Sequence, residues 1–159
     1  MSAHPRDEGP SAVAPSGSPE RPLHTRPLML ALVFAGGLLG TLCRWGAGRL
    51  LGTRGGWPIG TLAVNLLGAL VLGCLLEALA HHPDEGGRRA LRLGLGTGFC
   101  GALTTYSAFA TELALLADRA SPALALGYLC ASVAGGLGCA WAGIGLAERA
   151  RRGRGAGRR

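Results

Sequence analysis

The stretch from Gly98 to Glu112 reads GFCGALTTYSAFATE and lies in a segment without charged residues that runs from Leu93 to Thr111. The segment is long enough to cross a bilayer, which takes roughly 17–25 residues. Its middle is rich in glycine, threonine and serine, an unusual composition for a membrane helix. Bare backbone and hydroxyl groups at membrane depth are tolerated only where protein buries them or a wet cavity faces them. Interrupted helices of this kind indicate an ion or substrate site.

Long uncharged stretches recur along the chain of 159 residues, which is 48% hydrophobic and has a positive mean hydropathy. Between charged residues they cover 27–43, 55–76, 93–111 and 120–147. Buried helices of a globular core would be shorter and would carry a polar stripe with a period of about 3.6 residues. The sequence therefore predicts an all-α membrane protein with one transmembrane domain over residues 27–147. We expect four spanning helices at about 28–50, 57–80, 90–117 and 122–147, with the third one broken mid-membrane.

The composition at the two ends of the chain predicts tails outside the transmembrane domain. Residues 1–26 are rich in proline, serine, glycine and charge, so we expect a disordered tail. Residues 148–159 form a basic tail, for which anionic membrane lipid is the expected partner.

On the first helix, Gly36 and Gly40 form a small-residue face that lets another helix approach closely. In the third segment we expect helix to about Cys100, a non-helical break from Gly101 to Thr104, and helix again to about Ala117.

The net charge of +7 is carried by sixteen arginines and no lysine. Nucleic-acid binding is the usual alternative for a basic chain, but these arginines flank the apolar segments and lack the motif context for base reading. With four spans, both termini lie on one side of the membrane. Twelve arginines belong to that side and three to the other, with Arg44 set aside as intramembrane. We therefore expect a cell-membrane protein with cytoplasmic termini.

Charged and amide side chains inside the apolar segments each have two interpretations. Arg44, near the end of the first helix, either snorkels to the membrane surface or concentrates anions at a pore mouth. Asn65, about two turns into the second helix, either joins helices through hydrogen bonds or donates its amide to an ion in a pore. Glu112 either caps its helix at the interface or belongs to an access route. Spacing alone leaves these alternatives open.

Aromatic and hydroxyl side chains share faces of the third and fourth helices. Tyr106 and Phe109 are three residues apart with Ser107 beside their face, and Tyr128 and Ser132 are four apart. Carbonyl groups freed at the break can coordinate a hard cation such as Na⁺. An intramembrane enzyme would need a nucleophile paired with a base, and Ser107 has no histidine or lysine in its segment. We expect a transport protein and no enzymatic activity.

Three motifs and a shorter fourth one resemble the Fluc (CrcB) fluoride-channel family. They are Gly36-Gly37-x-x-Gly40-x-x-x-Arg44, Pro58-x-Gly60-Thr61-x-x-x-Asn65-x-x-Gly68, Gly98-Phe99-Cys100-Gly101-x-x-Thr104-Thr105-Tyr106-Ser107-x-Phe109-x-x-Glu112, and Tyr128-x-x-x-Ser132. The similarity covers roughly residues 28–147. It implies an antiparallel dimer of four-helix subunits with two fluoride pores and a buried central Na⁺. It also implies passive export of fluoride, which lowers its toxicity in the cytoplasm.

The resemblance assigns roles by position. Backbone carbonyls of Gly101 and Thr104 would bind Na⁺, and the amide of Asn65 would donate to fluoride. The aromatic box would be formed by Tyr106 and Phe109. Ser107, Tyr128 and Ser132 would lie on or near a polar track, while Arg44 and Glu112 match charged positions of the family.

Two features depart from the family pattern. Tyr106 stands where phenylalanine is usual, and Ala108 replaces the usual threonine, so the tyrosine hydroxyl either extends the polar track or blocks the pore. The charge bias is the second departure, because a chain that forms an antiparallel homodimer must insert both ways. We therefore favour a heterodimer with an oppositely oriented paralogue over a homodimer. The alternative function is a non-conducting partner subunit of such a heterodimer.

A small multidrug exporter is the main rival from another class. It shares the antiparallel four-helix dimer, but its mechanism needs a carboxylate in the middle of the first helix. Residues 28–43 contain none, which argues against this rival.

Overall fold

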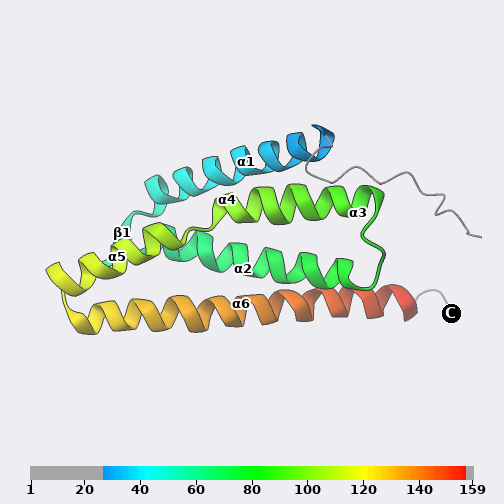
Figure 1. Cartoon of the computed structure of the whole chain (residues 1–159). Helices are drawn as coiled ribbons and strands as arrows, with labels where there is room; N and C mark the ends of the chain where they lie inside the picture. Colours follow the sequence, from blue (N-terminus) through cyan, green and yellow to red (C-terminus); the bar gives the residue numbers. More distant parts are fainter. Residues whose placement is uncertain (1–26, 157–159) are drawn as a thin grey trace, which may run out of the picture.

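The computed structural model describes residues 27–156, with side chains up to residue 153. The elements run in the order α1 (Pro27–Leu51), β1 (Thr53–Arg54), β2 (Trp57–Pro58), α2 (Ile59–Ala80), α3 (Gly86–Leu91), the π-helical segment η2 (Arg92–Cys100), α4 (Gly101–Leu103), α5 (Tyr106–Arg119) and α6 (Pro122–Ala156). Figure 1 shows them as long helical rods lying side by side. The expected disordered tail, residues 1–26, lies outside the described residues.

Within residues 27–156, four helical segments are long and apolar enough to cross a membrane. They are α1, α2, the run 86–119 that joins α3 to α5, and α6 as far as residue 153. This confirms the prediction of four apolar spans. Large apolar side chains such as Phe34, Leu50 and Trp141 are mostly exposed on the bundle. A surface of this kind is suited to contact with lipid or with another subunit.

Glycines permit the closest helix contacts of the bundle. The helix α1 packs along η2, where a Cβ at Gly36 would clash with the carbonyl of Gly94 and one at Gly40 with the carbonyl of Phe99. The small-residue face predicted on the first helix is therefore present, and η2 is the helix that approaches it. The contact between α2 and α6 works in the same way, with Gly143 against the backbone of α2.

A two-stranded hairpin joins α1 to α2, where the sequence predicts a short loop. Its strands pair antiparallel with Arg54 opposite Trp57. Gly55 and Gly56 between them have φ angles of 58° and 85°. Two successive residues with positive φ form the tight turn that matches strand twist, and glycine adopts it without a Cβ clash. The hairpin brings the Trp57 ring against the Tyr128 ring of α6, with centroids 6.1 Å apart.

The third spanning segment is interrupted, but further along the chain than the sequence predicts. Gly101–Leu103 remain helical as α4, and the chain leaves the helix at Thr104 and Thr105, whose ψ angles are 155° and 122°. Figure 1 shows this interruption between α4 and α5. The prediction of a break from Gly101 to Thr104 is therefore corrected, because Gly101–Leu103 are helical and the interruption covers Thr104 and Thr105. Packing of α4 against α1 outweighs the weak helix preference of Gly101.

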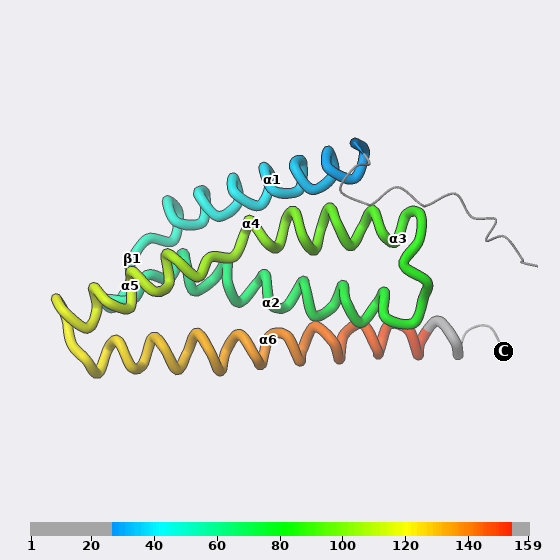
Figure 2. Tube along the Cα trace, in the orientation of Figure 1, coloured from blue at the N-terminus to red at the C-terminus, as the bar shows by residue number. Residues whose placement is uncertain are grey.

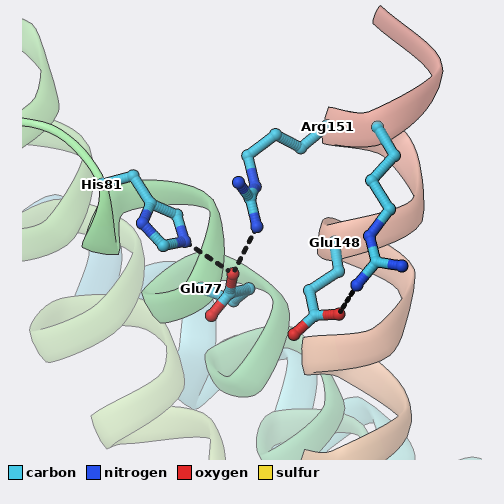
Figure 3. Close-up of polar contacts among 5 residues, drawn as sticks. Glu77, His81, Glu148 and Arg151 are labelled. Carbon is cyan, nitrogen blue, oxygen red and sulfur yellow. Dashed lines mark hydrogen bonds and ion pairs between the residues drawn. The ribbon is translucent and has the colours of Figure 1, made fainter. Parts of the chain in front are cut away.

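The helix α6 continues past its predicted end near residue 147, through the first part of the basic tail. Arg152 donates a hydrogen bond to Glu148 at 3.1 Å, one helical turn away. Arg151 lies 3.8 Å from the carboxylate of Glu77 in the last turn of α2, as Figure 3 shows. Arginine favours helix, and these contacts stabilise the added turns.

The turn between α2 and α3 lies at the same end of the bundle as this extension (Figure 2). His81 is exposed and contacts Glu77 at 3.0 Å (Figure 3). Arg92 donates two hydrogen bonds to the Asp84 carboxylate, at 3.0 and 2.6 Å, and Arg89 donates to the Asp84 carbonyl at 2.7 Å. The Arg92 guanidinium lowers the pKa of the Asp84 carboxyl. Ion pairs thus order the turn.

Candidate functional site: a groove at the broken helix

Asn65 of α2 binds the backbone at the break. Its Oδ1 accepts a hydrogen bond from the Thr105 N–H at 2.8 Å, and its Nδ2 donates to the Thr105 carbonyl at 3.1 Å. In a continuous helix, the Thr105 N–H would bond to the carbonyl of Gly101, four residues back. The amide replaces that partner and satisfies both backbone groups of an extended residue, which makes the break tolerable inside a bundle. The second N–H of the Asn65 side-chain amide takes no part in these two hydrogen bonds.

Thr105 also begins the second half of the segment. Its hydroxyl accepts a hydrogen bond from the Ala108 N–H at 3.2 Å and so caps the N-terminus of α5. The same hydroxyl lies 3.2 Å from the hydroxyl of Ser107. Polar groups therefore gather where the positive end of the helix dipole favours negative charge.

An open groove of about 360 Å³ lies beside the break. It is lined by Asn65, Thr104, Thr105, Tyr106, Phe109, Ser132 and Val133. The hydroxyl of Ser132 is buried and has no hydrogen-bond partner among the described residues. The Tyr106 side chain is 80% exposed, and its ring centroid lies 6.1 Å from that of Phe109. An unpaired hydroxyl and an amide N–H beside apolar walls suit a small ligand that accepts hydrogen bonds.

Three helices meet at the carboxylate of Glu112 on α5. Thr61 of α2 donates a hydrogen bond to Oε1 at 2.6 Å, and Tyr128 of α6 donates to Oε2 at 2.9 Å. The ring of Tyr128 is fully buried between Phe109, at a centroid distance of 5.5 Å, and Trp57. Since Phe109 also lines the groove, a chain of contacts connects the groove to the carboxylate.

The break releases carbonyl oxygens of the kind that hold a hard cation. The Gly101 carbonyl loses the Thr105 N–H, and the Thr104 carbonyl loses the Ala108 N–H, because both donors bond elsewhere. Gly101 is exposed, with open space where a side chain would be. The guanidinium of Arg44 makes one long contact, 3.5 Å, with the Thr104 carbonyl. Carbonyl oxygens of this kind are ligands that a hard cation accepts. Among the described residues, no group of three or more His, Cys, Asp or Glu side chains is placed to hold a metal ion.

A family model described as "CrcB-like protein, Camphor Resistance (CrcB)" matches residues 31–144 of the chain. The chain belongs to the CrcB family. With its four apolar segments within residues 27–156, this CrcB protein is a multi-pass membrane protein.

Curated relatives of this CrcB protein have similar lengths. A protein of Cutibacterium acnes named "Fluoride-specific ion channel FluC 1" is 47% identical over 121 residues, which cover 75% of this chain and 85% of the relative. The "Fluoride-specific ion channel FluC" of Pseudomonas putida is 42% identical and covers 74% and 95%. "Fluoride-specific ion channel FluC 2" of Moorella thermoacetica is 44% identical, with coverage of 70% and 89%.

The structure brings most of the residues singled out in the sequence of this CrcB protein to three neighbouring places. Asn65, Thr104, Tyr106, Phe109 and Ser132 line the groove. Tyr128 and Glu112 bond to each other behind Phe109. Arg44, Gly101 and Ser107 lie at the break, where Arg44 is half-buried.

Two residues of this arrangement received no role from the sequence. Thr61 precedes Asn65 by four positions and therefore shares its helix face, a spacing that signals its contribution to the same polar surface. Thr105 gives no comparable signal, because its role depends on an amide that lies forty positions away in the sequence.

Proposed function

We propose that the chain is a subunit of a fluoride-selective channel that lets fluoride leave the cytoplasm passively and so lowers its toxicity there. The observation that carries the proposal is the groove beside the break, where Ser132 and the remaining amide N–H of Asn65 adjoin two aromatic rings. The names of the curated relatives support the choice of fluoride.

The chemistry of the groove suits fluoride. The ion is small and strongly hydrated, so a pore must replace its lost water with hydrogen-bond donors. Amide and hydroxyl groups supply such donors, and the positive edges of the Tyr106 and Phe109 rings add favourable electrostatics. Larger anions such as chloride gain less from donors held close together, which gives selectivity without any covalent chemistry.

The path continues from the groove toward Glu112. Its carboxylate would repel an anion, but hydroxyls of Thr61 and Tyr128 donate to its two oxygens and disperse part of the charge. Ser107, at the N-terminus of α5, offers a further hydroxyl near the start of this path. We assign the polar track to these groups.

A second subunit completes the site in this proposal. The groove is open, and Tyr106 is exposed, so a partner helix would close the pore from the other side. An antiparallel dimer brings two breaks together, where carbonyls of Gly101 and Thr104 would hold Na⁺. The bound cation would join the two subunits and add positive charge near both anion paths.

The partner is proposed to be a paralogue. By the sequence, twelve arginines belong to the side of the termini and three to the other, so this chain would insert with its termini in the cytoplasm. Relatives numbered FluC 1 and FluC 2 accord with paired genes. The exposed Tyr106 hydroxyl favours the second candidate function, a subunit that supports its paralogue but does not conduct.

Fluoride efflux from liposomes tests the proposal, with a fluoride electrode as the readout. The chain is reconstituted alone and together with its paralogue, and Asn65→Ser accompanies each sample. Efflux from the pair that Asn65→Ser lowers supports a conducting subunit. Efflux from the pair that Asn65→Ser leaves unchanged supports the non-conducting role. Folded protein without efflux in either sample would contradict the channel.

A further inference from the structure

We infer that Arg119 forms an anion-collecting mouth at the hairpin end of the bundle, opposite the termini, and raises the rate at which fluoride enters the pore from that end. The inference rests on the proposed function and identifies one entrance of the polar track. A second pocket, of about 250 Å³, lies between the hairpin and the last turns of α5. It is lined by Thr53, Gly56, Pro58, Glu112, Leu115, Leu116 and Arg119.

Glu112 connects this pocket to the groove. Its side chain lines the pocket, and its carboxylate accepts a hydrogen bond from Tyr128, whose ring contacts Phe109 on the groove wall. The contacts of Tyr128 with Phe109 and Glu112 thus link the lining of the groove to the lining of the pocket. An ion that leaves the groove past Phe109 and Tyr128 emerges beside Glu112, inside the pocket.

Arg119 shares the helix face of Glu112. The two residues are seven positions apart on α5, which places Arg119 about 10 Å further toward the end of the bundle. Arg119 is exposed, and no ion pair to it is found within residues 27–153. The pocket therefore has an unpaired cation at its rim and a hydrogen-bonded carboxylate at its inner end.

This order of charges suits the capture of an anion. At a separation of about 5 Å from the guanidinium, the Coulomb attraction in water raises the local concentration of an anion about four-fold. The attraction offsets the repulsion of Glu112 at the next step. It acts over about 30 Å at 0.01 M salt and about 3 Å at 1 M salt. The contribution of Arg119 must therefore disappear in concentrated salt.

A purely structural role for Arg119 predicts a different effect of its substitution on thermal stability and on the salt dependence of the flux. The residue lies in the last turn of α5, where a cation stabilises the helix dipole. Loss of that effect would lower thermal stability, and any loss of flux would be the same at low and high salt. The salt dependence of the flux separates the two roles.

Arg49 supplies a matched control at the same end of the bundle. It lies in the last turn of α1, its guanidinium packs over the Trp45 ring at 5.2 Å, and it is not part of the pocket lining. Arg49→Gln removes the same charge from the same end as Arg119→Gln. If only the net charge of that end matters, the two variants will behave alike.

The experiment measures the fluoride current of the complete channel in a planar bilayer, with its paralogue where the pair is required and with fluoride on the side that the hairpin of this chain faces. Wild type, Arg119→Gln, Arg119→Lys and Arg49→Gln are compared in about 0.01 M and about 1 M of an impermeant salt. We expect Arg119→Gln to lower fluoride entry from that side about three- to four-fold in dilute salt and to match wild type in concentrated salt. Arg119→Lys keeps the wild-type rate, and Arg49→Gln changes it by much less.

Each other outcome overturns the inference. Equal rates for wild type and Arg119→Gln in dilute salt exclude a role for Arg119 while the channel itself stands. A loss that persists in concentrated salt, together with lower thermal stability, identifies the structural role. Equal losses for Arg119→Gln and Arg49→Gln indicate net charge rather than the pocket. If the folded wild type conducts no fluoride, both the proposed function and the anion-collecting mouth are wrong.

Discussion

At the scale of single residues, Asn65 has two roles in one side chain. It bonds to both backbone groups of Thr105 and lines the groove. The sequence leaves open whether this asparagine joins helices or faces a pore, because its spacing is compatible with both. The geometry makes the alternatives compatible, since an amide has two N–H donors and only one is needed for the backbone.

We predict that Asn65→Ser lowers both stability and flux. Serine is too short to reach the N–H and the carbonyl of Thr105 together, so at least one half-buried backbone group is left without a partner. The cost is about 1–3 kcal/mol of unfolding free energy. Thermal unfolding in detergent and fluoride efflux measure the two effects. A variant with wild-type stability and lowered flux would show that the bonds to Thr105 contribute little.

Thr61 provides a second test at this scale. Thr61→Val keeps the shape of the side chain but removes the hydroxyl that donates to Glu112 at 2.6 Å. The carboxylate then carries more unshielded negative charge beside the proposed path, and we expect efflux to fall several-fold. Thr111→Val is the matched control, because Thr111 is exposed and adjacent to Glu112 in the chain. Equal efflux from the two variants would argue against a path past Glu112.

At the scale of elements, the sequence predicts the spans and one of their contacts but not the finer boundaries. The length of the stretches without charged residues identifies the four apolar spans found within residues 27–156. The spacing of Gly36 and Gly40 predicts a close helix contact. The observed break lies further along the chain than the predicted one. Glycine content indicates where a helix is weak, but the helix ends where another group replaces its backbone hydrogen bonds. That group belongs to Asn65, which lies on another helix.

The contact between α1 and η2 predicts opposite effects for two glycines of α1. A Cβ at Gly40 would clash with the Phe99 carbonyl, so Gly40→Ala must push the helices apart, at a cost of about 1–3 kcal/mol. Gly46 has open space around it, so Gly46→Ala adds helix propensity and stabilises by about 0.5–1 kcal/mol. Thermal unfolding of both variants in the same detergent tests this. Destabilisation of equal size at both sites would contradict it.

The turn between α2 and α3 predicts a pH dependence. Hydrogen bonds from Arg92 lower the pKa of Asp84 in the folded protein, so the folded state holds the ionised carboxylate more strongly than the unfolded chain does. The resulting stability is present above the ordinary carboxyl range and is lost as the pH falls below about 4. Asp84→Asn should remove this part of the pH dependence, measured as the thermal midpoint between about pH 3 and 6. Glu85→Asn is the control.

At the scale of the whole molecule, the sequence assigns twelve arginines to the side of the termini and three to the other, and the proposed pore needs a partner to close the open groove. Both features concern assembly. An antiparallel partner can close the groove only if it is inserted the other way, and the arginine bias opposes that insertion for a second copy of this chain. Orientation in the membrane thus decides whether a lone chain can form the proposed pore.

We predict that a reporter fused to the C-terminus is found on the cytoplasmic side alone. Replacing Arg88, Arg89, Arg149, Arg151, Arg152, Arg154, Arg158 and Arg159 with glutamine leaves four arginines on that side against three on the other. Because this removes most of the bias, the variant should insert both ways and show fluoride efflux without the paralogue. Lysine at the same positions keeps the charge and therefore the single orientation. A wild-type reporter divided equally between the two sides would instead mean that the chain pairs with itself.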